Sequence, residues 1–474
     1  MRLVGRARTV FAILGAALVC AGGASAAAGW TEVTINASDG TPLACAYIIP
    51  GGTAPAGGWP GVILFHGLGQ SHTDMEPYGA ALAQFGFAAL ACDARGTGAS
   101  GGKFGLDGPT EVQDAQDLFT WFAARSDVSD TEIGAFGQSL GGGEVLNAAV
   151  AGVPFKAIVP AVGWTDLGQA FNPNGVPKIG LLNELLQVVP ASQWDPSLGP
   201  VQDDLLGGTV STAVKNIEAA RSSRSKLGTL HVPTFLLQGR HDFLFDMDQA
   251  IAAYKLLAGP KRLYLGDIGH APAKNPSAEE PTYLTEVLGW FDEYLAGGPK
   301  VGGGVELAHD PWDRTTSHFE GLPRTRHKSA SLPGRKTLKT ISNTASNTTR
   351  SVRLTGGPLE TFGDGYVTVR YSGQSNYGWL IASVSVKGNS TPVTFGAARL
   401  RKTKQSGTVR IPLSDQAVFL PRGKRLVVTV GRGFADGVFT SAAAGADQVP
   451  PIFRKITIGG ITLNLSLLEH TVSK

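Results

Sequence analysis

The 474-residue sequence predicts an α/β domain with a mostly parallel sheet, followed by an all-β sandwich domain. In the first 300 residues, short apolar runs alternate with helical patterns, which is typical of consecutive βα units. The glycine-rich residues 299–304 end this pattern and indicate a linker. Beyond them, short β-branched runs separated by turns are typical of a sandwich. An apolar content of 42% is enough to give each domain its own core.

The N-terminus has the pattern of a secretory signal peptide, predicted over residues 1–26. A start rich in arginine precedes an apolar run over residues 10–19, which is too short to span a bilayer. Ala24, Ser25 and Ala26 form a small-residue cleavage site, and residues 26–28 are an alternative one. No later segment has the length and apolarity of a membrane span. We therefore expect the mature protein in the periplasm or the medium.

The α/β domain is predicted over residues 30–298. It begins with two antiparallel strands within residues 30–50, joined at Asp39 and Gly40. A helix over 107–124 is indicated by apolar residues at helical spacing, with Pro109 near its start. A second clear helical pattern over 279–295 closes the domain. Between these elements, strands are expected over 61–65, 87–92, 133–136, 157–162, 232–237 and 262–265.

Residues 137–141 read Gly-Gln-Ser-Leu-Gly and carry the candidate nucleophile, Ser139. They lie between a strand-like run and a small-residue helix over 142–150, which is the context of a nucleophile elbow. A sharp turn from strand to helix strains the serine backbone and exposes its hydroxyl, and the flanking glycines relieve the crowding. The motif and its flanks together predict an α/β-hydrolase fold.

The partners of Ser139 follow in the order that this fold requires. Asp242 comes just after one expected strand, and His270 comes just after the next. His270 would take the serine proton as general base, and Asp242 would orient the imidazole. Asp246 is an alternative acid, but it lies farther from its strand and could instead cap the helix that starts at residue 247.

An oxyanion hole needs two backbone N–H donors. The residue after the nucleophile, Leu140, is expected to supply one. The other is expected from Leu68, in the loop after the strand over 61–65, with Gly67 as an alternative. His66 is interpreted as a support for that loop. No cluster of histidines and carboxylates has the spacing of a metal site, and the triad chemistry needs no cofactor, so neither is expected.

Residues 164–230 form an insertion much longer than an ordinary connection between strands. Its helical apolar patterns over 179–189 and 205–220 predict a helical cap over the active site that shapes substrate specificity. The alternative is an insertion that has no role at the active site. Removal of the signal leaves Cys45 and Cys92 on strands expected to be neighbours. A disulfide between them is possible in an oxidising compartment. Because cross-strand disulfides are strained, we expect free buried thiols instead.

The all-β domain is predicted over residues 305–474, with strands over 366–371, 380–386, 407–411, 425–430 and 456–465. Residues 300–474 carry 24 Lys and Arg against 10 Asp and Glu, whereas residues 1–299 carry 17 against 28. A charge of +14 on one part and −11 on the other suggests an anionic partner, such as a surface polymer, for the β domain. Attraction between the two domains explains the same asymmetry. No nucleic-acid motif is present, so nucleic acid is not an expected partner.

Residues 93–102 read Asp-Ala-Arg-Gly-Thr-Gly-Ala-Ser-Gly-Gly, and they carry a family resemblance. This loop resembles the one after the fourth strand of the Xaa-Pro dipeptidyl-peptidase and cocaine-esterase-like hydrolases, the S15 peptidase family. That resemblance implies an α/β-hydrolase domain, a helical cap inserted late in the sheet and a C-terminal jelly-roll-like β domain. Residues 363–371 and 417–430 look like strands of that β domain. It also implies a serine hydrolase of amides or esters, with Ser139, Asp242 and His270 as its triad.

Taken together, these features predict an exported serine hydrolase that acts on a peptide or ester substrate through an acyl-enzyme intermediate. An Xaa-Pro dipeptidyl-peptidase-like enzyme is the main expectation. A carboxylesterase or lipase-like enzyme and an acyltransferase are alternatives on the same machinery. A non-catalytic protein that binds a surface polymer is an alternative from another class. A dipeptidyl-peptidase needs a group in the cap that binds a free amino terminus, for which Asp166, Glu184 and Asp195 are candidates.

Overall fold

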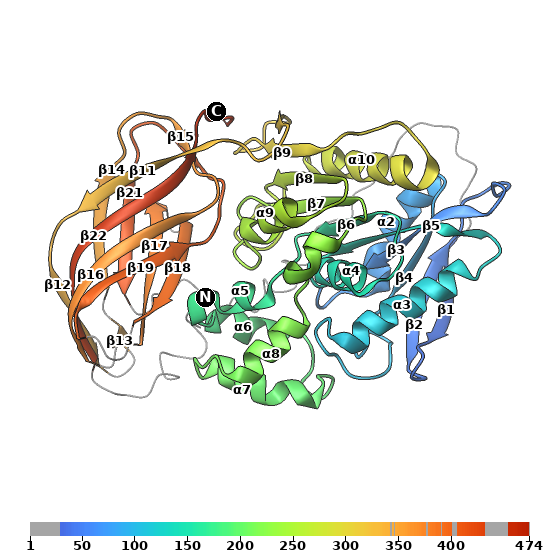
Figure 1. Ribbon diagram of the computed structural model, residues 1–474, viewed down its shortest axis with the longest axis horizontal. Coiled ribbons are helices and arrows are strands. Elements are labelled where there is room, and N and C mark those ends of the chain that lie inside the picture. Colours follow the sequence, from blue (N-terminus) through green and yellow to red (C-terminus); the bar gives the residue numbers. More distant parts are fainter. Residues whose placement is uncertain are drawn as a thin grey trace.

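The computed structural model describes residues 29–341, 344–345, 347–375, 378–389, 391–400, 405–431 and 454–473. The predicted signal peptide lies outside these residues. Figure 1 shows a sheet flanked by helices on one side of the molecule and a β-rich region on the other. Within the described part of the chain, no helix is long and apolar enough to cross a membrane. The two-part α/β and all-β fold class predicted from the sequence is confirmed.

The large sheet has ten strands in the order β1-β2-β4-β3-β5-β6-β7-β8-β9-β10. Every pair from β4 to β9 is parallel, and the pairs at the two ends are antiparallel. The central strands are apolar on both faces because helices cover both. The ten strands are Thr31–Asn36 (β1), Pro42–Ile48 (β2), Trp59–Phe65 (β3), Ala88–Cys92 (β4), Val128–Gln138 (β5), Ile158–Ala161 (β6), Thr234–Gly239 (β7), Lys261–Gly266 (β8), Gly304–Ala308 (β9) and Thr316–Phe319 (β10).

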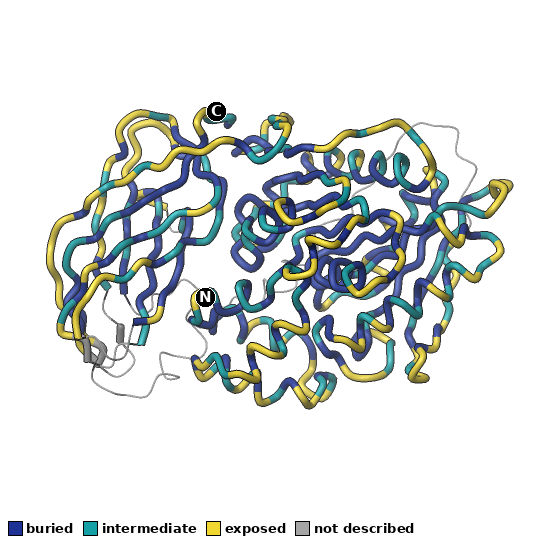
Figure 2. The backbone as a smooth tube through the Cα atoms, viewed as in Figure 1, coloured by how far each residue is buried: buried dark blue, intermediate teal, exposed yellow. Residues whose placement is uncertain are grey.

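Two hydrophobic cores lie on opposite faces of this sheet. In β3, the side chain of Ile63 belongs to one core, whereas those of Val62 and Leu64 belong to the other, as the alternation along a strand requires. Helices α3 (Pro109–Ala123), α4 (Leu140–Ala151) and α9 (Met247–Leu256) complete the first core. Helices α2 (His72–Gln84) and α10 (Glu280–Phe291) complete the second, followed by a π-helical turn over Asp292–Ala296. In Figure 2 most of the backbone inside this part of the molecule is coloured as buried.

The predicted linker does not end the large sheet. Strand β9 pairs in parallel with β8, and β10 pairs with β9, so the sheet continues to Phe319. Gly304, interpreted from the sequence as a chain breaker, has a positive φ of 102°. A Cβ atom there would collide with the Phe319 carbonyl. The glycine therefore permits close strand pairing, and the predicted domain boundary at residue 305 is wrong.

The insertion between β6 and β7 is helical, and it gathers below the sheet in Figure 1. Its apolar side chains form a core of their own with Phe104, Leu140 and Phe245 of the sheet domain. The helices are α5 (Leu167–Phe171), α6 (Ile179–Leu185), α7 (Gly199–Leu206) and α8 (Thr212–Ala220), with 3-10 turns over Pro173–Gly175, Pro196–Leu198 and Arg224–Thr229.

The β-rich region contains one six-stranded and one four-stranded antiparallel sheet, whose apolar side chains share a core. All five strands predicted here are present. The larger sheet contains β11 (Thr325–Leu332), β12 (Lys336–Ile341), β13 (Thr344–Ala345), β16 (Gly365–Ser375), β19 (Gly407–Leu413) and β22 (Arg454–Leu468). The smaller contains β14 (Thr348–Arg353), β17 (Trp379–Val386), β18 (Pro392–Arg399) and β21 (Arg425–Gly431), and β15 (Leu359–Glu360) pairs with β20 (Phe419–Leu420).

The expectation of free thiols is also wrong. Strands β2 and β4 are antiparallel, and their register places Cys45 directly opposite Cys92. Their Cα atoms are 4.0 Å apart, and the two side chains form a disulfide.

Candidate active site

Ser139 occupies the turn between β5 and α4, with φ of 56° and ψ of −111°. This positive φ is a strained conformation for a residue with a side chain, and such strain is typical of a nucleophile elbow. A Cβ atom on Gly137 would collide with the Gly141 carbonyl, and one on Gly141 would collide with the Phe65 carbonyl. The two glycines are therefore required by the close approach of the backbone around the serine.

The structure brings Ser139, His270 and Asp242 together in one hydrogen-bonded chain. Ser139 Oγ lies 2.8 Å from His270 Nε2, and His270 Nδ1 lies 2.7 Å from Asp242 Oδ2. Because Nδ1 donates to the carboxylate, Nε2 is free to accept the serine proton. The His270 main-chain N–H also donates to Asp242 Oδ2, at 2.9 Å. The three residues have the geometry that the sequence order predicted for them.

Backbone donors hold the Asp242 carboxylate in place. Its second oxygen, Oδ1, accepts hydrogen bonds from the N–H groups of Leu244 at 2.8 Å and Phe245 at 2.9 Å. The residue is completely buried. Asp246, the alternative acid, lies instead at the N-cap position of α9, and its carboxylate accepts from the Asp415 N–H at 3.3 Å. No hydrogen bond joins Asp246 to His270 among the described residues.

Leu68 and Leu140, the two expected oxyanion donors, line the same pocket as Ser139. Among the described residues, no acceptor is hydrogen-bonded to the N–H of Leu68 or of Leu140. The N–H of Gly67, the alternative donor, is already bonded to Gln70 Oε1 at 2.8 Å. The N–H groups of Leu68 and Leu140 therefore remain the candidate donors to a substrate oxygen.

His66 supports the loop that carries Leu68. Its Nδ1 donates to the Gly67 carbonyl at 2.7 Å, and its Nε2 accepts from the Ala94 N–H at 2.9 Å. Burial lowers the pKa of His66, which favours the neutral ring that can both donate and accept.

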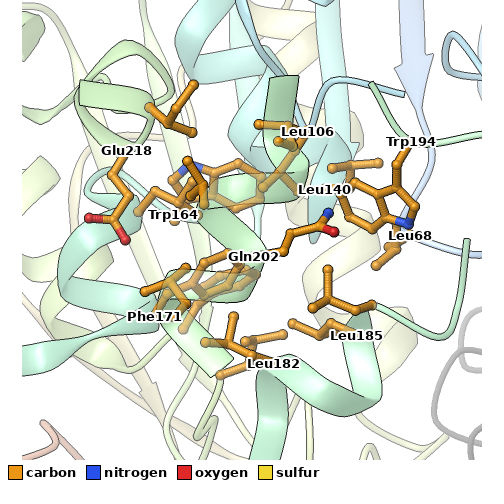
Figure 3. Close-up of a pocket in the computed structure, with 18 of the residues that line it drawn as sticks. Leu68, Leu106, Leu140, Trp164, Phe171, Leu182, Leu185, Trp194, Gln202 and Glu218 are labelled. Carbon is orange, nitrogen blue, oxygen red and sulfur yellow. The ribbon is translucent and has the colours of Figure 1, made fainter. Parts of the chain in front are cut away.

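An apolar pocket begins at Ser139 and extends under the cap (Figure 3). Its empty volume is about 810 Å³, part of which is open to solvent. The sequence predicted a cap here but did not identify the residues that line it. Besides Leu68, Leu140 and Ser139, the lining comes from Leu106, Trp164, Leu167, Phe171, Leu182, Leu185, Leu186, Trp194, Leu198, Val201, Gln202, Leu205, Ile217, Glu218, Leu244 and Phe245.

Glu218 is the one carboxylate among the residues lining this pocket. Burial raises its pKa to about 7, and Asn172 Nδ2 donates to its carboxylate. The three candidates for binding an amino terminus lie elsewhere. Asp166 and Asp195 cap the starts of short helices by accepting from backbone N–H groups, and Glu184 is exposed.

The cap and the β-rich region both contact the loop that carries Asp242, a relationship that the sequence did not suggest. Lys178 of the cap donates to the carbonyls of Phe243 at 2.9 Å and Leu244 at 3.1 Å. Gln416 of the β-rich region donates to the Asp242 carbonyl at 2.8 Å. The sequence signal for the Lys178 contact was a lysine within an apolar segment of the cap. Burial lowers the pKa of Lys178.

Potential metal ligands gather in one place within the described residues. Side-chain ligand atoms of Glu32, His72 and Glu76 lie within 4.8 Å of one another. His72 is also bonded to Asp93 at 2.8 Å, and none of the three lines the apolar pocket. This group is therefore separate from the candidate active site.

Known proteins share parts of the sequence and nearly all of the fold. Residues 39–202 match the model of the X-Pro dipeptidyl-peptidase (S15) family. The "Uncharacterized 31.7 kDa protein in traX-finO intergenic region" of Escherichia coli is 32% identical over 109 residues. Those residues are 23% of this chain, and the chain spans only 38% of the length of that relative.

The similar solved structures include a CocE/NonD family hydrolase from Staphylococcus aureus, at 14% identity, with a TM-score of 0.69 over 94% of this chain and 98% of that one. An aminopeptidase from a Thaumarchaeota archaeon is 13% identical, with a TM-score of 0.69 over 93% and 97%. An α-amino acid ester hydrolase is 14% identical, with a TM-score of 0.69 over 96% and 99%. Residues 39–202 are therefore similar to the S15 family, and the chain shares the α/β-hydrolase fold of these solved structures.

Proposed function

We propose that the protein is an exported serine hydrolase that cleaves esters with a bulky apolar acyl group. Ser139 Oγ attacks the carbonyl carbon while its proton passes to His270 Nε2, and Asp242 stabilises the resulting imidazolium. The N–H groups of Leu68 and Leu140 bind the oxyanion of the tetrahedral intermediate. Collapse of this intermediate expels the alcohol, which takes the proton from His270, and leaves an acyl group on Ser139.

A water molecule then completes the cycle. His270 takes a proton from the water as it attacks the acyl carbonyl, and a second tetrahedral intermediate forms at the same two N–H donors. Its collapse returns the proton to Ser139 Oγ and releases the carboxylic acid. No group beyond the three side chains and two backbone donors is needed for either half of the reaction.

The proposal of an ester with an apolar acyl group rests on the side chains that line the pocket under the cap. Leucine, tryptophan and phenylalanine side chains surround the space next to Ser139, and such a surface favours an apolar ligand. A free amino terminus would need a charged partner in this space. Glu218 is poorly suited because its carboxyl group is bonded to Asn172 and its raised pKa of about 7 leaves it only partly ionised near neutral pH.

A dipeptidyl-peptidase is the second candidate, and the family match over residues 39–202 favours it. The two candidates are separated by a paired assay of the mature protein. p-Nitrophenyl esters with acyl chains of increasing length are tested beside Gly-Pro and Ala-Pro nitroanilides. Ester cleavage that rises with chain length supports the esterase, whereas cleavage of the nitroanilides alone rejects it. Product analysis with an added alcohol detects transfer to an acceptor other than water.

The proposal places the mature enzyme outside the cytoplasm. The arginine-rich start and apolar run of residues 1–26 support export, and so does the Cys45–Cys92 disulfide, since such bonds persist mainly in oxidising compartments. Fractionation of expressing cells and N-terminal sequencing test this point. The expected mature chain begins at Ala27, and a full-length chain that stays in the cytoplasm would reject export.

The positive charge of residues 300–474 supports an anionic surface polymer as a partner of the β-rich region. Retention of the S139A variant on an anionic polysaccharide matrix, lost as salt is raised, is the expected result. Passage through the matrix at low salt would reject this partner.

A further inference from the structure

One polar side chain that lines the apolar pocket has a buried donor atom without a partner among the described residues. Gln202 lies on α7 and lines the pocket, and its Nε2 atom is buried without a hydrogen bond among the described residues. Figure 3 shows its amide in the middle of the labelled apolar side chains, between Trp164, Leu140 and Leu185. The carboxylate of Glu218 points away from the same group.

An unpaired amide in such a place has a free-energy cost, because its N–H loses water and gains no acceptor. The neighbouring positions on α7 show the ordinary pattern of a cap helix. Val201 and Leu205 are buried in the cap core, and Asp203 is exposed to solvent. A leucine at position 202 would fit the apolar lining without this cost. The amide is therefore best explained by a ligand that completes its hydrogen bonds.

We propose that Gln202 determines substrate specificity by donating a hydrogen bond to a second oxygen of the substrate. The substrate would then be an ester with a mostly apolar acyl chain that carries a carbonyl or ether oxygen within the chain. This inference rests on the proposed function, because it concerns the acyl group held next to Ser139. Leu68 and Leu140 serve the scissile carbonyl, so the amide of Gln202 is left for the second oxygen.

Other polar groups of the pocket do not offer this contact. Ser139 is bonded to His270, and Glu218 is held by Asn172. The remaining side chains that line the pocket are apolar, apart from the indole N–H groups of two tryptophans. Trp164 Nε1 donates to the Arg221 carbonyl at 2.7 Å, and Trp194 Nε1 donates to the Val189 carbonyl at 3.1 Å. The unpaired donor of Gln202 is thus distinguished from every other polar group that lines this space.

The test compares p-nitrophenyl octanoate with the isosteric esters in which one chain methylene, from C4 to C7, is replaced by an ether oxygen. The leaving group and the scissile bond are identical throughout. In the wild-type enzyme, one oxygen position should be favoured over the others. Gln202→Leu should lower kcat/KM for that ester by roughly 3- to 10-fold, as expected for one neutral hydrogen bond, and leave the octanoate rate equal or higher.

Gln187→Leu is the matched control. It makes the same chemical change on the exposed surface of the cap, where the Gln187 side chain donates to the Asn183 carbonyl at 2.8 Å, and it should leave both rates unchanged. Gln202→Leu should also raise Tm in the absence of ligand, because an unpaired buried amide is removed. The inference is overturned if Gln202→Leu changes all the rates by the same factor.

Failure of the proposed function and failure of the Gln202 inference give different experimental results. If wild-type enzyme cleaves no ester in the series, the proposed function is wrong, but the role of Gln202 is still measurable. Binding of octanoic acid and of its ether analogues to wild type and to Gln202→Leu is then compared by calorimetry. A preference for one ether analogue that is lost in the variant supports the inference, and equal affinities in both proteins reject it.

Discussion

The side chain of Gln416 donates a hydrogen bond to the main-chain carbonyl of Asp242 at 2.8 Å, so the β-rich region directly supports the proposed catalytic acid. The contact spans 174 positions of the chain, and Gln416 itself is buried. Lys178 of the cap holds the next two carbonyls of the same loop. The loop is therefore fixed by the cap and by the β-rich region as well as by its own strand.

Replacing Gln416 by leucine keeps most of the side-chain volume and removes this bond. We expect kcat to fall by roughly 3- to 10-fold with little change in KM. The reason is that Asp242 is held less firmly beside His270, while the residues of the substrate pocket are unchanged. Steady-state kinetics on the best ester measure both constants. Gln113→Leu, on the exposed surface of α3, is the control and should behave as wild type. An unchanged kcat in Gln416→Leu would show that the β-rich region does not position the acid.

A buried ion pair joins the same two parts of the protein. Arg240 and Glu360 are both fully buried, and Arg240 Nη2 lies 2.5 Å from Glu360 Oε1. Arg240 also donates to the carbonyls of Ala308 and Ala417. Glu360→Gln should lower the free energy of unfolding by about 3 kcal/mol or more, because the guanidinium charge stays buried without its counterion.

Chemical denaturation measures this loss. Glu320→Gln removes a charge from an exposed position and should change the free energy of unfolding by no more than about 0.5 kcal/mol. If the two variants were equally stable, the buried pair would not contribute to the joining of the two parts.

Glu218 should make stability depend on pH. Burial raises its folded-state pKa to about 7, above the ordinary value near 4.5, so the folded protein keeps a proton that the unfolded chain loses. As pH rises between these two pKa values, the contribution of Glu218 to folding stability decreases. Above pH 7 the carboxyl group is ionised in both states, and the decrease is complete. Glu218→Gln, which retains an acceptor for Asn172, removes this dependence.

The measurement is the difference in Tm between the variant and wild type across pH 5 to 8. We expect the variant to gain about 2 °C or more relative to wild type over this range. Asp203→Asn, which removes a carboxylate at an exposed position of the cap, is the control. A difference in Tm that stays constant with pH would mean that Glu218 is ionised in the folded protein.

Local sequence context is enough to place Ser139, Asp242 and His270, because each follows a strand whose apolar pattern is strong. The contacts of Gln202, Lys178 and Gln416 cannot be predicted in this way. They depend on how the cap and the β-rich region pack on the sheet, and no local pattern encodes that packing.

Two predictions are wrong because both depend on how strands pair, which the local sequence does not determine. Glycine favours turns, so Gly303 and Gly304 predict a chain break, yet Gly304 permits close strand pairing next to Phe319. The prediction of free thiols at Cys45 and Cys92 depends on a general objection to cross-strand disulfides. Their direct opposition across β2 and β4 depends on strand register, which the sequence does not determine.

The most direct test of the central claim is covalent labelling with a fluorophosphonate, followed by peptide mass spectrometry. An activated serine forms a stable phosphonyl adduct, so we predict a single adduct on Ser139 in the wild-type protein. Both Ser139→Ala and His270→Ala should lose the adduct and at least about 10⁴-fold of the ester hydrolysis rate, with unchanged circular dichroism. Label on another residue, or full hydrolysis by Ser139→Ala, would contradict the assignment of the nucleophile.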